Sequence, residues 1–254
     1  MTPDDAPLPR VTSHANPDLP YWLMEPGVQR PSLWFRFCRE MLRGFMPAFW
    51  KTRIFNRCYE PASGGALYIS NHQSFLDPIL MSFALRRPMN YMARDTLFRT
   101  PGFKQLISSV YAFPVKRGTA DLGALKEAMR RLKDGGQVVL FAEGTRTLDG
   151  RIAPLLPGVA MLAQRAARWI VPVVIDGAYE CWPRTQPLPS PGLISVQYAP
   201  PIPQSEARKL GAEQFMSHVR DILIQTQHDL RRRTGREPFD YSKEDAQAPQ
   251  SHNK

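Results

Sequence analysis

Residues 67–81 read LYISNHQSFLDPILM and contain a strand, a polar turn and the start of a helix. The apolar run that ends at Ser70 predicts the strand, and Asp77 followed by Pro78 predicts an N-cap with proline at the first helical position. His72 and Asp77 lie about 140° apart around an ideal helix, so they cannot share one helical face. We therefore expect His72 in the turn, with one Asp77 oxygen facing the imidazole and the other capping the helix.

Strand-like and helix-like patterns alternate along most of the chain. The predicted strands are 67–70, 90–93, 112–115, 138–141, 170–175 and 193–198, and the predicted helices are 78–86, 102–109, 121–133, 158–168 and 206–233. This alternation predicts one α/β domain whose mixed, mostly parallel sheet is flanked by helices, and 254 residues suit one such domain. The domain is expected at 59–234, between flexible tails at 1–29 and 235–254.

The chain is basic, with 33 Lys plus Arg against 23 Asp plus Glu and a formal net charge of +10. This charge favours an anionic partner, such as nucleic acid, a membrane surface or a phosphorylated substrate. Cys38, Cys58 and Cys181 are too widely spaced for a disulfide framework or a metal-ligand cluster, so no metal is expected. No secretion signal is recognised, and no apolar run reaches the ~18–20 residues of a spanning helix, so membrane contact would be peripheral.

Residues 30–57 have the composition of an interfacial membrane anchor, with seven Lys/Arg, one Glu and seven Phe/Trp. Apolar side chains recur at helical spacing, at Trp34, Phe37, Cys38, Met41 and Phe45. Pro47 is expected to end this helix, and a second amphipathic helix is expected up to residue 58. The alternative is that these helices pack on the core of the domain, because core helices also carry aromatic stripes.

A second polar turn follows the apolar strand 138–141 and contains Glu143-Gly144-Thr145-Arg146. Arg146 can bind a phosphate through two parallel hydrogen bonds, Thr145 can donate a hydroxyl, and Gly144 allows a tight turn. Glu143 can accept a hydrogen bond from a substrate hydroxyl or hold Arg146 in place. The alternative for these four residues is a surface turn with an ordinary Glu–Arg ion pair.

His72 and Asp77 suit proton abstraction from an alcohol. A neutral imidazole takes a proton near neutral pH, and a carboxylate on its other nitrogen fixes the tautomer and favours the imidazolium that forms. A structural histidine beside a helix-capping aspartate is the alternative. Ser74 lies nearby but lacks the Gly-x-Ser-x-Gly context of a serine nucleophile, so direct attack by a substrate hydroxyl is the simpler mechanism.

Four blocks of the chain, taken together in order and spacing, resemble the glycerolipid acyltransferases typified by 1-acyl-glycerol-3-phosphate acyltransferase. These are Asn71-His72-x-x-x-x-Asp77, Phe113-Pro114-Val115-x-Arg117, Phe141-x-Glu143-Gly144-Thr145-Arg146 and Val171-Pro172-Val173. The resemblance implies acyl transfer from acyl-CoA or acyl carrier protein to a hydroxyl of a lysophospholipid, with no further cofactor. By motif match, His72 is the general base and Asp77 its partner. Arg117 and residues 143–146 bind the acceptor, and the Val171-Pro172 block shapes the acyl or acceptor site.

The resemblance further implies a peripheral enzyme on the cytoplasmic face of the inner membrane, anchored through residues 30–57, that converts 1-acylglycerol-3-phosphate to phosphatidic acid. Many members carry lysine in a Pro-Phe-Lys-x-Gly segment where this chain has Leu156 in Pro154-Leu155-Leu156-Pro157-Gly158. A different acceptor, such as an amino-acid-containing lyso-lipid, therefore stays open. The rivals from other classes are a non-catalytic lipid-binding scaffold, a lipid hydrolase and a nucleic-acid-binding module. No recognised motif supports the last, and nucleic acid is not an expected partner.

Overall fold

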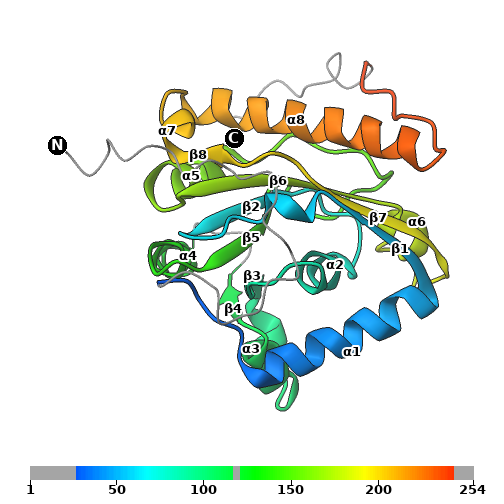
Figure 1. Cartoon of the computed structure of the whole chain (residues 1–254), viewed down its shortest axis with the longest axis horizontal. Helices are drawn as coiled ribbons and strands as arrows, with labels where there is room; N and C mark the ends of the chain where they lie inside the picture. Colours follow the sequence, from blue (N-terminus) through cyan, green and yellow to red (C-terminus); the bar gives the residue numbers. More distant parts are fainter. Residues whose placement is uncertain (1–26, 117–120, 243–254) are drawn as a thin grey trace, which may run out of the picture.

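An eight-stranded sheet runs through the middle of the computed structural model, which describes residues 27–116 and 121–242 (Figure 1). The strands are β1 (Trp50–Phe55), β2 (Ala66–Ser70), β3 (Met89–Arg94), β4 (Ala112–Val115), β5 (Gln137–Phe141), β6 (Trp169–Asp176), β7 (Gly192–Tyr198) and β8 (Ile202–Pro203). Their order is β1-β7-β6-β2-β5-β3-β4, and β8 pairs with β6. Only β6–β7 and β6–β8 are antiparallel among these pairs of described strands, so the expectation of a mixed, mostly parallel sheet is confirmed.

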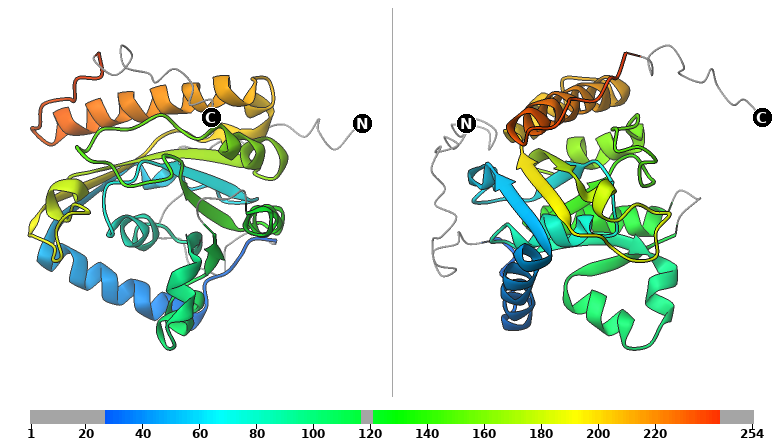
Figure 2. Two further views of the ribbon diagram at one scale, coloured as in Figure 1. Left: turned by 180° about the vertical axis from the view of Figure 1, so that it is seen from behind. Right: turned by 90° about the vertical axis from the view of Figure 1, so that its right-hand side faces the viewer.

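Helices cover both faces of this sheet. They are α1 (Leu33–Phe49), α2 (Asp77–Phe83), α3 (Phe103–Ser109), α4 (Leu122–Lys133), α5 (Ala160–Arg165), α6 (Ala178–Cys181), α7 (Gln204–Ala207) and α8 (Ala212–Arg233). Figures 1 and 2 show α1 and α2 on one side of the sheet and α8 on the other. Side chains of β2 alternate between the two cores: Tyr68 packs in the core that includes Leu80, and Leu67 and Ile69 pack in the core that includes Val219. Because both faces of β2 are covered, its sequence is almost continuously apolar.

The start of the described chain differs from the prediction of two amphipathic helices. Helix α1 continues through Pro47 to Phe49, so the predicted break at this proline is wrong. Proline removes one backbone hydrogen bond only in the last turn, and the burial of Met46 and Trp50 in the core holds that turn in place. The predicted second helix is instead strand β1, which pairs with β7 over six residues. Its Lys51 and Arg53 are exposed while Trp50 is buried, which is the alternation of a strand.

The two predicted tails are also partly ordered. Residues 235–242 are bound to the domain, with Arg236 paired to buried Asp176, and the amide of Asn90 donates to Gln29 at 2.8 Å. The predicted helix 206–233 is divided into α7 and α8 because Gly211 has an extended backbone. Residues 1–26, 117–120 and 243–254, which include the rest of each predicted tail, lie outside the described residues.

Helix α1 packs on the domain through a side that does not contain the predicted apolar stripe. Phe35, Met46 and the guanidinium-bearing Arg39 are buried there, and Arg39 donates to the carbonyls of Leu85 and Arg86 at 3.2 and 2.9 Å. Four of the five predicted stripe residues face outward, with exposed fractions of 49% for Trp34, 58% for Phe37, 59% for Met41 and 50% for Phe45, whereas Cys38 is partly buried. Phe49, which was not in the predicted stripe, is 54% exposed and extends it. The stripe is therefore unburied, although the helix does pack on the core. Within the described part of the chain, no helix combines the length and the apolar composition needed to cross a bilayer.

Candidate active site

The two polar turns begin side by side at the carboxyl edge of the sheet. Ser70 at the end of β2 is in register with Phe141 at the end of the parallel strand β5, so His72 and Glu143 each lie two residues beyond a matched pair. On the other side of β2, Asn71 donates to the carbonyl of Ile175 and accepts from its N–H, both at 2.8 Å. Ligands of open α/β folds bind at this edge.

The side chains of His72 and Asp77 form a hydrogen-bonded pair. Nδ1 of the imidazole lies 2.7 Å from Oδ2 of Asp77, and the ring stacks on Phe141 with centroids 4.2 Å apart. The same oxygen accepts the backbone N–H groups of Gln73 and Ser74 at 2.6 and 2.8 Å. A carboxylate oxygen can only accept, so Nδ1 carries the proton and Nε2 of the neutral ring is left with a lone pair. The ring is thus held in the tautomer that a general base requires.

The prediction that one Asp77 oxygen binds the imidazole while the other caps the helix is wrong. Helix α2 begins at Asp77 with Leu76 in the N-cap position, one residue earlier than expected. A single oxygen, Oδ2, accepts both the imidazole and the two N–H groups of the preceding turn. Asp77 therefore orders the turn that carries His72 as well as the imidazole itself.

The buried carboxylate of Glu143 holds two pieces of backbone. Its Oε1 accepts the N–H of His72 at 2.7 Å, and its Oε2 accepts the N–H of Ala153 at 2.9 Å. The pKa of Glu143 is raised to about 7, because burial and the charge of Asp77 raise it by more than the two N–H groups and Arg220 lower it. Both oxygens are directed to backbone groups, so Glu143 fixes the position of His72. A contact of Glu143 with an acceptor stays a prediction.

The remaining residues of the second turn lie at the surface beside the pair. Gly144 has φ of +74°, which favours glycine, and a Cβ there would lie 3.0 Å from the Leu156 side chain. Thr145 is exposed, and the Arg146 guanidinium stacks on the Phe75 ring at 3.6 Å from its centroid. This contact joins the second turn to the first.

The structure thus brings together six of the seven predicted site residues. These are His72, Asp77, Glu143, Gly144, Thr145 and Arg146. Arg117, the seventh, lies outside the described residues. Val171 and Pro172, predicted to shape a substrate site, are instead buried within the sheet beside Tyr68 and Ile69. Their apolar side chains belong to the core.

A cavity beside this corner has both apolar and polar lining. It measures about 540 Å³ and is lined by Phe75, Trp182, Arg184, Thr185, Gln186 and Pro187. Three leucines on the loops of this edge are also exposed, Leu148 at 69%, Leu156 at 52% and Leu188 at 75%. The hydroxyl of Ser74 donates to the Trp182 carbonyl at 2.9 Å, so this hydroxyl has a structural role. A substrate with both an anionic group and an apolar chain would match these surroundings.

The sequence analysis missed Gln73, which links three segments at this edge. Its Nε2 donates to the Gly150 carbonyl at 3.0 Å, and its Oε1 accepts the N–H groups of Ala178 and Tyr179 at 3.1 and 3.2 Å. All three partners lie more than 70 residues away along the chain. No local sequence signal could have identified them.

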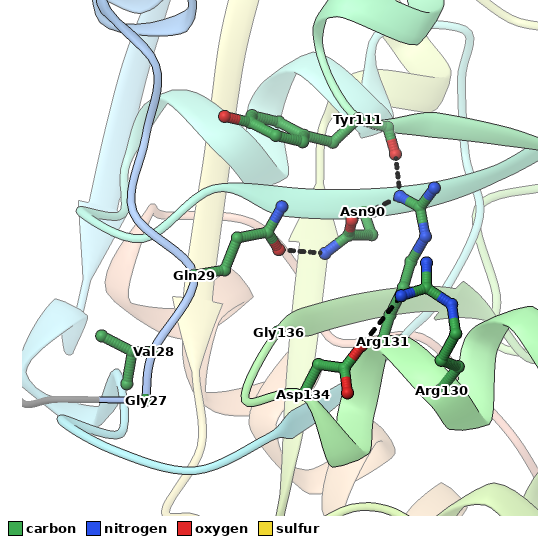
Figure 3. A pocket seen from close by; sticks show the side chains of 9 residues that line it. All are labelled: Gly27, Val28, Gln29, Asn90, Tyr111, Arg130, Arg131, Asp134 and Gly136. Atoms are coloured by element: carbon green, nitrogen blue, oxygen red, sulfur yellow. Dashed lines mark hydrogen bonds and ion pairs between the residues drawn. The ribbon is translucent and has the colours of Figure 1, made fainter.

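A second cavity, of about 420 Å³, lies at the opposite, amino edge of the sheet and has a different character (Figure 3). Arg131 there donates to Asn90 and to the Tyr111 carbonyl, and Arg130 is paired with Glu127 and with Asp134. These arginines are bound to protein groups, and the cavity holds no counterpart of the His72–Asp77 pair.

Comparison with known proteins agrees with this geometry. The family model described as "Acyltransferase" matches residues 51–176, from strand β1 to the end of β6. Residues 51–176 therefore form a domain of the acyltransferase family. The solved 1-acyl-sn-glycerophosphate (LPA) acyltransferase from Thermotoga maritima shares the fold, with a TM-score of 0.64 at 21% identity over 77% of this chain and 81% of that chain.

Two curated relatives illustrate the range of the match. The protein named 1-acyl-sn-glycerol-3-phosphate acyltransferase from Bacillus subtilis is 24% identical over 77% of this chain and 96% of its own. The chloroplastic 1-acyl-sn-glycerol-3-phosphate acyltransferase BAT2 of Brassica napus is 32% identical over 53% of this chain and 40% of its own. The chain therefore spans less than half of the plant relative, and nearly all of the bacterial one.

Proposed function

We propose that this acyltransferase-family chain transfers a fatty acyl group from a thioester to the free hydroxyl of a lysophospholipid. The observation that carries the proposal is the His72–Asp77 pair beside the turn that contains Thr145 and Arg146. One corner thus supplies an oriented base and an anion-binding guanidinium. The names of the bacterial and plant relatives support 1-acylglycerol-3-phosphate as the leading acceptor.

The reaction proceeds by direct attack in this proposal. Nε2 of His72 removes the proton from the acceptor hydroxyl as its oxygen bonds to the thioester carbonyl carbon. Asp77 stabilises the imidazolium that forms. The tetrahedral intermediate then collapses with cleavage of the C–S bond, and the imidazolium returns its proton to the leaving thiolate. The structural hydrogen bond of Ser74 to Trp182 supports a mechanism without a serine acyl-enzyme.

The proposal also concerns the head group of the acceptor and the carrier of the acyl donor. Arg146 and Thr145 would bind the acceptor phosphate, together with Arg117 by motif match. Leu156, which is 52% exposed beside Gly144, favours a second candidate in which the acceptor is another lyso-lipid, such as an amino-acid-containing one. The donor is acyl-CoA or acyl carrier protein, and the proposal includes no metal and no further cofactor.

A mass-spectrometric screen tests the function. Purified protein is incubated with an acyl donor, either acyl-CoA or acyl-loaded acyl carrier protein, and with one of several lyso-lipid acceptors. Each donor is also incubated without any acceptor. The expected result is an O-acylated lipid that forms only when both substrates are present, most of it from 1-acylglycerol-3-phosphate. Free fatty acid without acceptor-dependent product would indicate a hydrolase. Vesicle binding without any product would indicate a non-catalytic scaffold.

We further propose that the exposed stripe of α1 attaches the protein peripherally to the cytoplasmic face of the inner membrane. Trp50, directly after α1, pairs with Gly192 at the start of β7, and β7 runs antiparallel to β6. The end of α1 therefore lies at the same edge of the sheet as His72. Burial of the stripe contributes ~25 cal/mol per Å², and nearby cations contribute ~1 kcal/mol each on an anionic bilayer.

Vesicle co-sedimentation tests this attachment. The double variant Phe37→Ser/Met41→Ser should lose most binding to anionic vesicles. A matched control, Leu122→Ser/Leu210→Ser, removes two exposed leucines outside α1 (65% and 37% exposed) and should bind as the wild type does. Equal loss in both variants, or wild-type binding to DNA rather than vesicles at matched salt, would contradict the proposal.

A further inference from the structure

The chain that follows α8 lies against the loop that follows β5. We call residues 235–242 the C-terminal strap and residues 147–153 the site loop. The hydroxyl of Tyr241 in the strap accepts the N–H of Ile152 at 2.8 Å and donates to Oε1 of Gln227 on α8 at 2.5 Å. Phe239 packs on Gly150 so closely that a Cβ there would lie 2.9 Å from the Phe239 ring. The strap therefore fixes both the backbone and the path of the site loop.

The strap is itself attached to the sheet by a buried ion cluster. Asp176, the fully buried last residue of β6, pairs with Arg231 through Oδ1 and with Arg236 through Oδ2, both at 2.7 Å. Arg231 also donates to the Glu237 carbonyl at 2.6 Å and lies 3.9 Å above the Phe239 ring. Breaking such a buried cluster would leave an uncompensated charge, so this attachment is rigid.

The site loop in turn contacts the turn that carries His72 directly and along two further paths. The N–H of Thr147, the first residue of the loop, donates to the His72 carbonyl at 2.8 Å. The Gly150 carbonyl accepts Nε2 of Gln227 at 3.1 Å and Nε2 of Gln73 at 3.0 Å. The N–H of Ala153, adjacent to Ile152, donates to Glu143 at 2.9 Å, and Glu143 accepts the N–H of His72 at 2.7 Å. Each step of both paths is a hydrogen bond.

We infer that Tyr241 is a positioning residue for the catalytic base. It holds the site loop so that Glu143 and Gln73 keep the backbone of His72 in place while Asp77 holds its ring. The hydroxyl of Tyr241 binds Ile152 and Gln227, so it would act on the imidazole through the site loop. The expected effect of Tyr241 on the rate of acyl transfer rests on the proposed function, because His72 acts as a base only if acyl transfer occurs. A structural role alone would lower stability without changing the chemical step.

The test compares Tyr241→Phe with a matched control, Tyr111→Phe. The first variant keeps the ring and removes the hydroxyl that binds Ile152. The control removes a bond of the same kind at the amino edge, where the Tyr111 hydroxyl accepts the N–H of Ser32 at 3.0 Å. For Tyr241→Phe we expect kcat to fall about tenfold, within the roughly 100-fold loss that a small misplacement of a catalytic group causes, at unchanged acceptor KM. Amide hydrogen exchange in 70–77 and 150–154 should become faster. Tyr111→Phe should change neither quantity.

Three results would overturn the inference: unchanged kcat and exchange in Tyr241→Phe, equal changes in both variants, or a raised acceptor KM without a fall in kcat. Failure of the proposed function is distinguishable from these results. It would show as wild-type protein that makes no acylated lipid. The exchange of residues 70–77, measured without substrate, would still decide whether Tyr241 holds the turn of His72.

Discussion

At the amino edge of the sheet the arginine side chains are bound to carboxylates, amides and carbonyls of the protein, whereas at the carboxyl edge an imidazole and a guanidinium border an apolar surface. Arg130 and Arg131 illustrate the first arrangement, since both bind Glu127. His72 and Arg146 illustrate the second, with one ring stacked on Phe141 and the guanidinium stacked on Phe75. Each edge has a cavity, and polar side chains line part of both.

Polar lining and cavity size therefore do not identify the site. At the amino edge the ionisable groups stabilise the ends of β3, β5 and α4. At the carboxyl edge Asp77 and Glu143 hold His72 from two sides, one at its ring and the other at its backbone N–H. Substitutions at the two edges should therefore separate cleanly, with losses of activity at one and losses of stability at the other.

The largest effect is expected for Asp77→Asn. The amide can donate to Nδ1 of His72, which favours the wrong tautomer, so kcat should fall by roughly 10²–10⁴-fold while the fold is retained. Steady-state kinetics of acyl transfer give the value. Asp134→Asn at the amino edge is the control and should keep wild-type kcat. Normal turnover of a folded Asp77→Asn protein would remove the dyad from the mechanism.

Arg146→Ala should raise the acceptor KM about 10- to 100-fold, because hydrogen bonds to a charged group contribute about 1.5–3 kcal/mol. Arg130→Ala is the matched control, since its side chain is 60% exposed in surface ion pairs. It should leave KM unchanged. KM is measured by varying 1-acylglycerol-3-phosphate at saturating donor. Equal KM values for the two variants would argue against phosphate binding at Arg146.

Arg131→Met should lower the free energy of unfolding by about 1–3 kcal/mol, because it leaves Asn90 and the Tyr111 carbonyl without their donor. Its kcat should remain that of the wild type, since the amino edge takes no part in the reaction. Urea unfolding and acyl-transfer assays on the same preparation provide both values. A fall in kcat at unchanged stability would contradict the assignment of a purely structural role to the amino edge.

Glu143 should make stability depend on pH in a specific direction. Its folded pKa of about 7 exceeds the ordinary value of 4.5, so the folded state keeps this proton after the unfolded chain has lost it. The free energy of unfolding of wild type minus that of Glu143→Gln should therefore fall as pH rises from about 4.5 to about 7, and then level off. Urea titrations at four pH values measure this difference. A difference that increases across this range would mean that hydrogen bonding outweighs burial.

Much of the catalytic corner was predictable because it depends on local sequence. Strand ends and the polar turns after them are recognisable from hydrophobic periodicity, and parallel pairing then places His72 next to Glu143. Leu76 in the N-cap position and β1 in place of a helix show the limits of local patterns. Trp50–Phe55 reads equally well as an amphipathic helix, and only its pairing with β7, some 140 residues away, decides the matter.

The roles of the polar residues were less predictable than their positions. Glu143 was expected to face a substrate or an arginine, and it binds two backbone N–H groups instead. The strap at 235–242 was expected to be a flexible tail, because nothing in its sequence indicates that Arg236 pairs with Asp176. Contacts between segments far apart in the chain determine both the role of Glu143 and the order of the strap. Local patterns in a single sequence do not indicate such contacts.

The most direct test of the account is the rate of acyl transfer to a lyso-lipid by His72→Ala protein whose unfolding curve matches that of the wild type. We expect a rate at least about 100-fold below wild type, since the general base is lost while Asp77 and Glu143 still order the turn. Transfer at the wild-type rate by this folded variant would contradict it.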